Sequence, residues 1–536
     1  DTVIVRAGTY NESVVVNETD IDIVTNESAT LNGSTVSGPA FNVTNAEKNV
    51  SNVGITGFTI TDYDTGVSIE GANVTNDPTL DMRNISVFNN TLEDISGTAV
   101  SVDHESGEFE RVNVANNTIT SAGSGVSVEV SGSTATENVT VAGNSMDEAI
   151  TGSGSAVSIA VSGTADLTDA NVLANNGTGA GTGLDVSLAD TAALSDVDVT
   201  GNDFSSTAGD SIAVETGTTS AQGVHLDGFT VDTNLLNDSL GAGLAVDSPA
   251  QNLSVSDLNV TGSDLSGSAR AVAIDVGASS TISTLDIVEN AINDSTAGDG
   301  LNVTAREDAT VDDITVTDSN GSKNANGVVL EARGSAAISG VEITDSLFYE
   351  NGGDAVFLGG SGTVQDVTVR ENGLNASGSG LGIVATAGGT VSNVTVADTN
   401  ASRGDGGLRI VSAGTSSTVD DISVTDTILN ETSGTGVYVS ADGQSEVMDV
   451  ALDTVDASGN DAGLEAYAND SATIENVSAS SALFGDSAGD AGVFQAGSDP
   501  GSTATIENVT LDTVGLNESD GTGLQVLANG GSSVTD

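Results

Sequence analysis

The stretch Gly434-Thr435-Gly436-Val437-Tyr438-Val439 contains the unit that decides the fold. A glycine-containing turn followed by an apolar–polar–apolar triplet predicts a short strand with one buried face. Closely related units begin at Gly123, Gly181 and Gly521. The first apolar residue of the unit returns about every 29 residues, which is the spacing of a repeat architecture. These residues are Val67, Val100, Val126, Val157, Leu184, Ile212, Leu244, Val272, Leu301, Val328, Val356, Leu381, Leu408, Val437, Leu464, Val493 and Leu524.

Each repeat is expected to hold three short strands. The first has the form Asn/Asp-Val-Thr-Val, as in residues 366–369, the second is the glycine unit, and the third is shorter, as in residues 362–364. Three strands and three turns in about 29 residues fit one coil of a parallel β-helix, whereas a β-propeller blade needs about 40 residues and four strands. We therefore predict an all-β solenoid of about 17 to 18 coils.

The domain prediction is one parallel β-helix over residues 1–536, with less regular coils in 1–50 and regular repeats in 51–536. Its interior should be a column of Val, Ile and Leu, because β-branched side chains pack well on a pleated surface. Phe58, Phe229 and Phe357 are expected to fill this interior in places.

The N-terminal stretch resembles the first coil of right-handed parallel β-helix proteins of the pectate-lyase-like superfamily. The resemblance is carried by Asp1-Thr2-Val3, by residues 7–12 and by Leu31-Asn32-Gly33. It implies a right-handed helix. Relatives usually place a short amphipathic capping helix before this coil, and the sequence ends within a repeat at residues 533–536. We therefore expect N- and C-terminal regions, and an anchor, beyond the given sequence.

A second repeated position lies about three residues after the end of the first strand. Stacked amides at one turn would lie about 4.8 Å apart and could hydrogen-bond from coil to coil. Asparagine ladders are also known in the β-helix superfamily that the chain resembles, so we interpret this column as structural rather than ligand-binding. Its asparagines are Asn90, Asn117, Asn144, Asn175, Asn202, Asn234, Asn290 and Asn372. Other coils carry Ser263, Ser319, Ser346, Thr399 and Thr427 there.

The chain is strongly acidic, with 77 Asp and Glu against 11 Lys and Arg and a net charge of -66. Hydrated carboxylates keep a protein soluble in high salt, where a Debye length of roughly 3 Å at 1 M screens their repulsion. The acidic residues are spread throughout, and Lys48 and Lys323 are the only lysines. We favour this halophilic interpretation over a dedicated calcium-binding surface. Nucleic acid and anionic membranes are poor partners for such a surface.

Asn-X-Ser/Thr sequons occur roughly two dozen times and favour an extracellular glycoprotein. The alternative is that Asn-Val-Thr is simply suited to a strand edge. The glycosylation candidates are Asn11, Asn17, Asn26, Asn138, Asn393, Asn430, Asn508 and Asn517. Acidity, lysine depletion and sequons together resemble secreted or surface glycoproteins of halophilic archaea. There are no cysteines, and no apolar run reaches the roughly 18 residues of a membrane span.

No catalytic residues are nominated. Lyases of this class need a basic residue close to acidic calcium ligands. Arg403, Asp405 and Arg409 come closest to such a set, but charge pairing on a turn explains them more simply. Asp312-Asp313 and Asp420-Asp421 are Asp pairs of the kind that galacturonan hydrolases use, but the accompanying Gly-His-Gly and Arg-Ile-Lys motifs are absent. The five tyrosines are scattered in sequence and there is no tryptophan, so no sugar-stacking platform is expected.

Asp299 and Asp405, in Gly-Asp-Gly turns, are the candidates for a shared Ca²⁺ or other cation, and no other cofactor is expected. The preferred function is an extracellular structural protein: a stiff, acidic, glycosylated rod acting as a surface stalk, adhesin repeat region or filament subunit. Its partners would be further copies, end-to-end or lateral, or other cell-surface proteins and glycans. The alternatives are a polysaccharide lyase or depolymerase and a non-catalytic glycan-binding protein.

Overall fold

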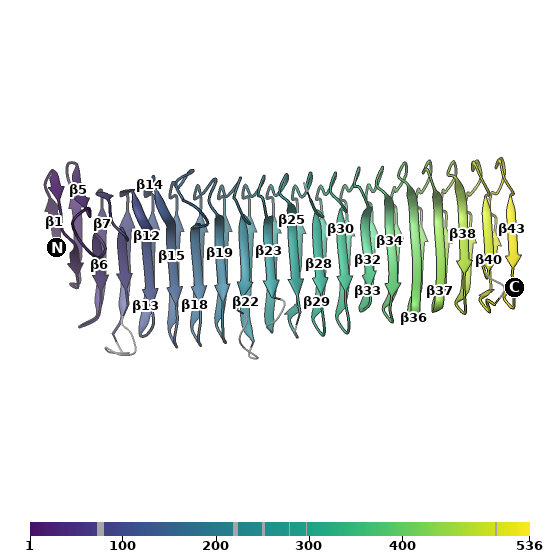
Figure 1. The fold of residues 1–536 in the computed structure, drawn as a ribbon, viewed down its shortest axis with the longest axis horizontal. Helices are drawn as coiled ribbons and strands as arrows, with labels where there is room; N and C mark the ends of the chain where they lie inside the picture. The colour runs from purple at the N-terminus through teal and green to yellow at the C-terminus, as the bar shows by residue number, and fades with distance from the viewer. Residues whose placement is uncertain are drawn as a thin grey trace. The chain divides into compact units, whose positions relative to one another are not determined.

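The computed structural model describes residues 1–71, 80–217, 223–248, 252–277, 279–295, 297–498 and 501–535. The chain divides into two compact units, Asp1–Ala269 (unit 1) and Arg270–Asp536 (unit 2). Both are built from β-strands, and no helix occurs in the described ranges (Figure 1). Accordingly, no described helix has the length and apolarity to cross a membrane. The predicted fold class is confirmed: the chain is a parallel β-solenoid of about 18 turns with roughly 28-residue coils.

Two long parallel ladders of strands run through each unit. We call the ladder that contains the Asp-Val-Thr-Val segments the corner sheet and the one that contains the glycine units the glycine sheet. In unit 1 the corner sheet comprises β1 (Thr2–Val5), β4 (Ile21–Thr25), β7 (Val50–Thr56), β10 (Met82–Phe88), β13 (Glu108–Ala115), β16 (Ala135–Ala142), β18 (Asp166–Leu173), β20 (Ala193–Thr200), β22 (Val224–Asp232) and β24 (Leu253–Thr261). Its glycine sheet comprises β3 (Val14–Val16), β6 (Phe41–Thr44), β9 (Val67–Glu70), β12 (Ile95–His104), β15 (Ala122–Val130), β17 (Ser155–Val161), β19 (Thr182–Leu188), β21 (Ile212–Thr216) and β23 (Ala242–Ser248). A short third sheet comprises β2 (Gly8–Tyr10), β5 (Ala29–Asn32), β8 (Thr59–Thr61), β11 (Thr91–Glu93) and β14 (Thr118–Ile119).

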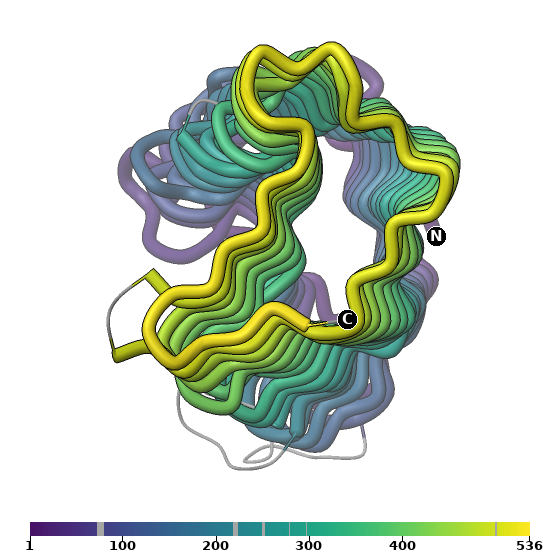
Figure 2. Tube along the Cα trace, turned by 90° about the vertical axis from the view of Figure 1, so that its right-hand side faces the viewer, coloured from purple at the N-terminus to yellow at the C-terminus, as the bar shows by residue number. Residues whose placement is uncertain are grey.

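Unit 2 repeats this arrangement. Its corner sheet comprises β26 (Thr281–Ile282), β27 (Leu285–Val288), β29 (Thr310–Thr317), β31 (Ala337–Thr344), β33 (Thr363–Arg370), β35 (Thr390–Ala397), β39 (Thr473–Ser480), β41 (Thr505–Glu507), β42 (Thr510–Asp512) and β44 (Ser533–Thr535). Its glycine sheet comprises β25 (Arg270–Val276), β28 (Leu301–Ala305), β30 (Val328–Ala332), β32 (Asp354–Gly360), β34 (Ser379–Thr386), β38 (Ala462–Ala468), β40 (Gly492–Ala496) and β43 (Leu524–Ala528). The long strands β36 (Gly406–Thr425) and β37 (Thr435–Asp453) contribute to both sheets. Figure 2 shows successive coils of unit 2, from teal to yellow, following one path.

The expected third and first strands of a coil are continuous. In β33 the chain runs from Thr363 to Arg370 and bends at Asp366, whose φ is 57°. Asn, Asp and Gly tolerate this left-handed conformation better than other residues do. The same corner recurs along the corner sheet at Asn52, Asn84, Arg111, Asn138, Asp169, Asp196, Gly228, Asp257, Asp313, Gly340, Asp366, Asn393, Asp421, Asp449, Asn476 and Asn508. This backbone requirement accounts for the Asn or Asp that opens most repeats, and Gly228 and Gly340 meet it as glycines.

The glycine units stack in register, as when Val437 pairs with Leu408 on one side and Leu464 on the other. One position in the repeat series was wrong. Gly492, not Val493, lies in register with Leu464, so Val493 points outward and Phe494 points into the core. A Cβ at Gly492 would lie 3.2 Å from Cδ1 of Leu524, the residue in register with it on the next coil.

The core is the predicted column of aliphatic side chains, and Phe58 and Phe229 are buried in it. The prediction for Phe357 was wrong. Val356 and Leu358 are the buried residues of β32, so the alternation of the strand turns Phe357 to the outer face, where it is half-buried. The domain boundaries predicted from sequence stay a prediction.

Candidate functional site

The predicted asparagine column lies at the turn between the corner sheet and the glycine sheet. In unit 1, Nδ2 of Asn117 donates to Oδ1 of Asn144 at 3.0 Å and to the Val87 carbonyl at 2.9 Å. Links of 3.0–3.1 Å of the same kind join Asn90 to Asn117 and continue along the column. The linked residues are Asn90, Asn117, Asn144, Asn175, Asn202 and Asn234. Because all six are at most 1% exposed, each amide satisfies backbone groups that water does not reach.

The column in unit 2 uses hydroxyls as well as amides. The backbone N–H of Asn290 donates to Ser319 Oγ at 3.3 Å, and the N–H of Ser319 donates to Ser346 Oγ at 3.1 Å. The N–H of Ser346 donates to Asn372 Oδ1 at 2.9 Å. Nδ2 of Asn372 reaches the Ile343 carbonyl at 2.7 Å. These contacts are those of a structural ladder.

A second buried ladder, which the sequence interpretation missed, lies five residues after the first. In unit 2 the N–H of Asn324 donates to Asn351 Oδ1, and the N–H of Ser295 donates to Asn324 Oδ1, both at 2.8 Å. The constant offset between the two polar positions of each turn is the sequence signal that would have revealed it. The buried members are Thr207, Ser239, Ser268, Ser295, Asn324, Asn351, Ser377, Thr432, Asn460 and Ser487.

The glycosylation candidates lie at the surface. Asn11, Asn26 and Asn517 are exposed, and Asn17 and Asn430 are half-exposed. Asn138, Asn393 and Asn508 are exposed members of the left-handed corner column. The last two are engaged: Asn393 Nδ2 donates to Asp366 Oδ1 at 2.6 Å, and Asn508 Nδ2 donates to Asn476 Oδ1 at 3.0 Å. The corner therefore explains why Asn precedes Val-Thr and also leaves these side chains accessible.

The two candidate metal ligands, Asp299 and Asp405, lie in different coils and contact amides or hydroxyls. Asp299 Oδ1 accepts from Asn326 Nδ2, and Asp299 Oδ2 accepts from Asn302 Nδ2, both at 2.7 Å. Asp405 Oδ1 accepts from Ser433 Oγ at 3.1 Å. Within the described ranges, no group of three or more His, Asp or Glu side chains is arranged to hold a metal ion. The cation site stays a prediction.

One ion pair on the outer face of the glycine sheet spans two coils. Nη2 of Arg409 lies 3.0 Å from Oδ2 of Asp354, and the side chains are 37% and 12% exposed. The pair passes over Gly382, where a Cβ would lie 2.5 Å from Asp354 Oδ2 and 3.1 Å from Arg409 Nη2. Arg403 instead pairs with Glu431 at 3.0 Å. Arg403, Asp405 and Arg409 thus form no cluster.

Two tyrosines meet on the same face, so the expectation of scattered tyrosines was wrong for this pair. The ring centroids of Tyr438 and Tyr467 lie 5.9 Å apart with the planes tilted by 42°. Tyr467 Oη donates to Glu465 Oε1 at 2.8 Å, and Thr435 Oγ1 donates to Glu465 Oε2 at 2.5 Å. Burial and Glu465 together raise the pKa of Tyr467. Since the tyrosines are separated by about one coil length, the repeat period itself could have revealed their proximity.

The glycine sheet of unit 1 carries a stack of carboxylates instead. Asp103 lies in register with Glu70 on one side and Glu129 on the other. Burial, reinforced by the charges of Glu129, Glu105 and Glu70, raises the pKa of Asp103 to about 6. The neighbouring His104 is buried against Phe109, with ring centroids 4.7 Å apart, and burial lowers its pKa to about 4. This histidine is a neutral core residue at physiological pH.

Carboxylates also come together on the corner sheet of unit 2. A shallow groove of about 460 Å³ is lined by Asp421, Asp449, Asn476 and Asn508, among others. Beside it, burial, the charge of Asp449 and a hydrogen bond with the Asp449 carboxyl raise the pKa of Asp420. The other Asp pair places Asp313 at a corner. The proximity of Asp420 to Asp449 crosses a coil boundary and was not predicted.

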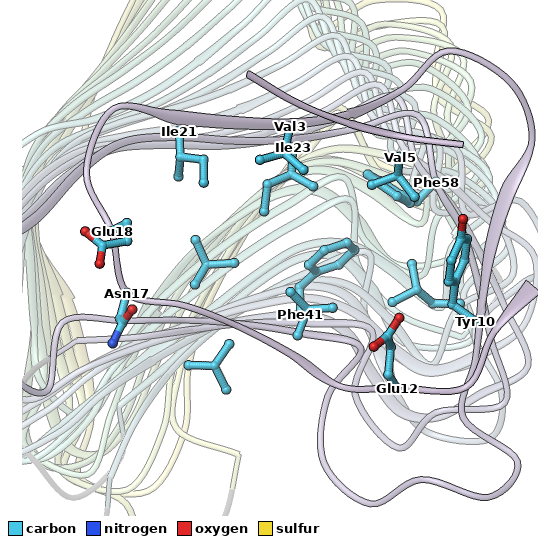
Figure 3. Close-up of a pocket in the computed structure, with 14 residues that line it drawn as sticks. Val3, Val5, Tyr10, Glu12, Asn17, Glu18, Ile21, Ile23, Phe41 and Phe58 are labelled. Atoms are coloured by element: carbon cyan, nitrogen blue, oxygen red, sulfur yellow. The ribbon is translucent and has the colours of Figure 1, made fainter. Parts of the chain in front are cut away.

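A cavity of about 420 Å³ opens at the first coils of unit 1 (Figure 3). Its wall consists mainly of core-type side chains such as Val3, Ile23 and Phe41. Tyr10 and Glu12 lie at one end, and Asn17 and Glu18 lie at the other. The cavity therefore continues the aliphatic core column.

Residues 299–479 match the family described as right handed beta helix region. No curated protein matches the chain. Among solved structures, the A-module of mannuronan C-5 epimerase AlgE4 from Azotobacter vinelandii is similar over 95% of this chain and 91% of that chain, with 12% identity and a TM-score of 0.15. At that score the likeness carries no statement about activity.

The matched stretch contains both the Arg409–Asp354 ion pair and the tyrosine pair. Neither is needed to form a coil, since neighbouring coils place Gly382 in register with Arg409 and Ser440 in register with Tyr467. Outward positions of the glycine sheet in unit 1 hold residues such as Ser158, Asp185 and Ala213. The outer face of β32, β34, β36, β37 and β38 is thus chemically distinct from the glycine sheet of unit 1.

Proposed function

We propose that the chain is an extracellular structural protein, a stiff, acidic, glycosylated scaffold that serves as a surface stalk, adhesin repeat region or filament subunit. The observation that supports this proposal is the buried asparagine ladder of unit 1. Asn144 alone links three successive coils, because it accepts from Asn117, donates to Asn175 and donates to the Val114 carbonyl. Fully satisfied buried polar networks rigidify a core.

The surface supports the same proposal. A net charge of -66 favours solubility and suits a medium of high ionic strength. The exposed sequon asparagines, including Asn11, Asn26 and Asn138, offer attachment points for glycans.

Fractionation of the native source tests the proposal. The chain is expected in the extracellular or cell-surface fraction, with glycan mass on peptides that contain Asn11, Asn26 or Asn138. Recovery in the cytoplasm, with these peptides at unmodified mass, would rule out the proposed location.

A polysaccharide lyase or depolymerase is the second candidate, and Asp420 beside Asp449 favours it. A carboxyl whose pKa is raised by burial and by a neighbouring carboxylate is better suited to act as a general acid than an isolated one. Reducing-end or unsaturated-sugar assays on acidic exopolysaccharides would test this candidate. Activity that is lost in Asp420→Asn and retained in Asp313→Asn, a corner aspartate of the same unit, would replace the structural proposal.

A further inference from the structure

Glu465, on the glycine sheet of unit 2, forms no ion pair with a basic residue in the described ranges. Both oxygens of the half-buried Glu465 accept hydrogen bonds, from Tyr467 and Thr435. Hydroxyl donors fix the orientation of the carboxylate but bring no positive charge. The group is oriented, partly desolvated and anionic.

Two aromatic rings border this carboxylate. Tyr438 lies in register with Glu465 on the preceding coil, and Tyr467 follows Glu465 by two residues on the same face of β38. Aromatic faces carry a negative quadrupole and attract cations placed within about 6 Å of the ring centroid. With centroids 5.9 Å apart and planes tilted by 42°, the two rings can contact one small cation together.

Arg409, the arginine in register with Tyr438, does not pair with Glu465. Arg409 pairs in register with Tyr438, but its guanidinium reaches across Gly382 to Asp354, away from the coil of Glu465. On the opposite side, Val493 lies in register with Glu465 and is only 4% exposed. An apolar neighbour lowers the local dielectric and strengthens the attraction between Glu465 and a cation.

We propose that Glu465, Tyr438 and Tyr467 form a binding site for an alkylammonium group. Glu465 supplies the counter-charge, and the rings contact the methyl or methylene groups next to the nitrogen. The ammonium could belong to a small quaternary amine or to a lysine side chain of a polypeptide. The proposal is independent of the structural function and of any catalytic role for Asp420.

NMR of the tyrosine ring resonances in the full chain tests this site directly. The chain has only five tyrosines and no tryptophan, so these resonances are few. Tetramethylammonium chloride would replace sodium chloride at a constant ionic strength of about 0.5 M, which holds screening fixed. We expect saturable shifts of the ring resonances of Tyr438 and Tyr467. Glu465→Gln should raise the dissociation constant about 5-fold or more, while Tyr467→Phe, which keeps the ring, should weaken binding less than Tyr467→Leu does.

Glu215→Gln is the matched control. Glu215 occupies an outward position on the glycine sheet of unit 1, in register with Asp247 and without an aromatic partner. Equal weakening by Glu215→Gln and Glu465→Gln would show only diffuse counter-ion attraction and overturn the proposal. Ring shifts that do not saturate would overturn it as well, as would a Glu465→Gln chain with lower stability but unchanged affinity. Titration with N-acetyl-lysine methylamide separates the sources: tighter binding than tetramethylammonium indicates a polypeptide lysine, and weaker binding indicates a small quaternary amine.

Discussion

A Cβ at Gly321 would lie 2.5 Å from Cδ1 of Phe348, the residue stacked on it one coil later. Gly321 has no left-handed backbone, so the glycine is needed for space alone. A similar relationship joins Gly177 and Phe204 in unit 1, where the Cβ would lie 3.0 Å from the ring. At both places the bulk of a phenylalanine in the core is matched by a glycine on the preceding coil.

Gly321→Ala should therefore destabilise unit 2. Overpacking a dense core costs about 1–3 kcal/mol, since the ring of the buried Phe348 has no free space to enter. Urea unfolding followed by circular dichroism measures the change. In a Phe348→Leu background the same substitution should cost less, because a smaller side chain leaves room for the methyl group.

Gly352→Ala provides the control for this prediction. Its nearest atom to an added Cβ is the Ala325 carbonyl oxygen at 3.7 Å, an ordinary contact. Equal effects at Gly321 and Gly352 would contradict the steric explanation.

The sequence predicted what a single coil repeats. Alternation in residues 434–439 identified the glycine strand, and recurring polar positions identified the first ladder. Which side chains of a strand point into the core and which point outward was harder to predict. Phe357 was placed in the core although Val356 already held the inward position of the same strand.

Contacts that skip a coil could not be predicted. Arg409 and Asp354 are 55 residues apart, and their pairing depends on the missing side chain of Gly382. Nor does sequence show that Gly492, rather than Val493, takes the position of Leu464, because both registers bury an apolar strand face. Such contacts depend on how particular neighbouring coils pack. The sequence pattern shared by all repeats does not show them.

Asn144→Asp tests the first ladder. The new carboxylate loses the donor that reaches the Val114 carbonyl and places a charge at a site 1% exposed, so we expect a loss of about 2–4 kcal/mol at neutral pH. Burial would raise the pKa of this carboxyl in the folded state above its unfolded value. The loss should therefore shrink as the pH falls through the folded pKa.

Asn138→Asp is the matched control on the same coil. Asn138 is exposed, and its left-handed corner accepts Asp, as the equivalent Asp169 shows. Its substitution should change stability by less than about 0.5 kcal/mol. A large effect at residue 138, or none at residue 144, would argue against a stabilising ladder.

Asp103→Asn tests the carboxylate stack in unit 1. The pKa of Asp103 is raised to about 6 in the folded chain, chiefly by burial. A raised folded pKa means that ionisation opposes folding: its contribution is fully favourable below the unfolded pKa of about 3.9 and is lost as the pH rises through about 6. The amide should therefore stabilise the chain by about 1 kcal/mol at pH 7.5, allowing for partial solvent screening.

At about pH 2.5, well below both pKa values, the same variant should match the parent chain in urea midpoint, because Asp103 is then largely protonated in both states. Stabilisation of equal size at both pH values would show that the substitution acts through packing and not through charge.

Thermal stability should rise steeply with salt. The 77 acidic side chains are opposed by only 11 basic ones. Most ion pairs in the described ranges lie at the surface, such as Lys48 with Glu18 at 2.7 Å. At low ionic strength the unscreened carboxylates destabilise the compact state, whereas molar salt shortens the Debye length to roughly 3 Å and removes most of this repulsion. Calorimetric scans in about 0.1 M and 2 M potassium chloride should show a higher Tm in the concentrated salt.

Sucrose at matched osmolality separates charge screening from general exclusion effects, because it carries no charge. A Tm that is unchanged by potassium chloride, or raised equally by sucrose, would contradict the proposal that this surface is built for high salt.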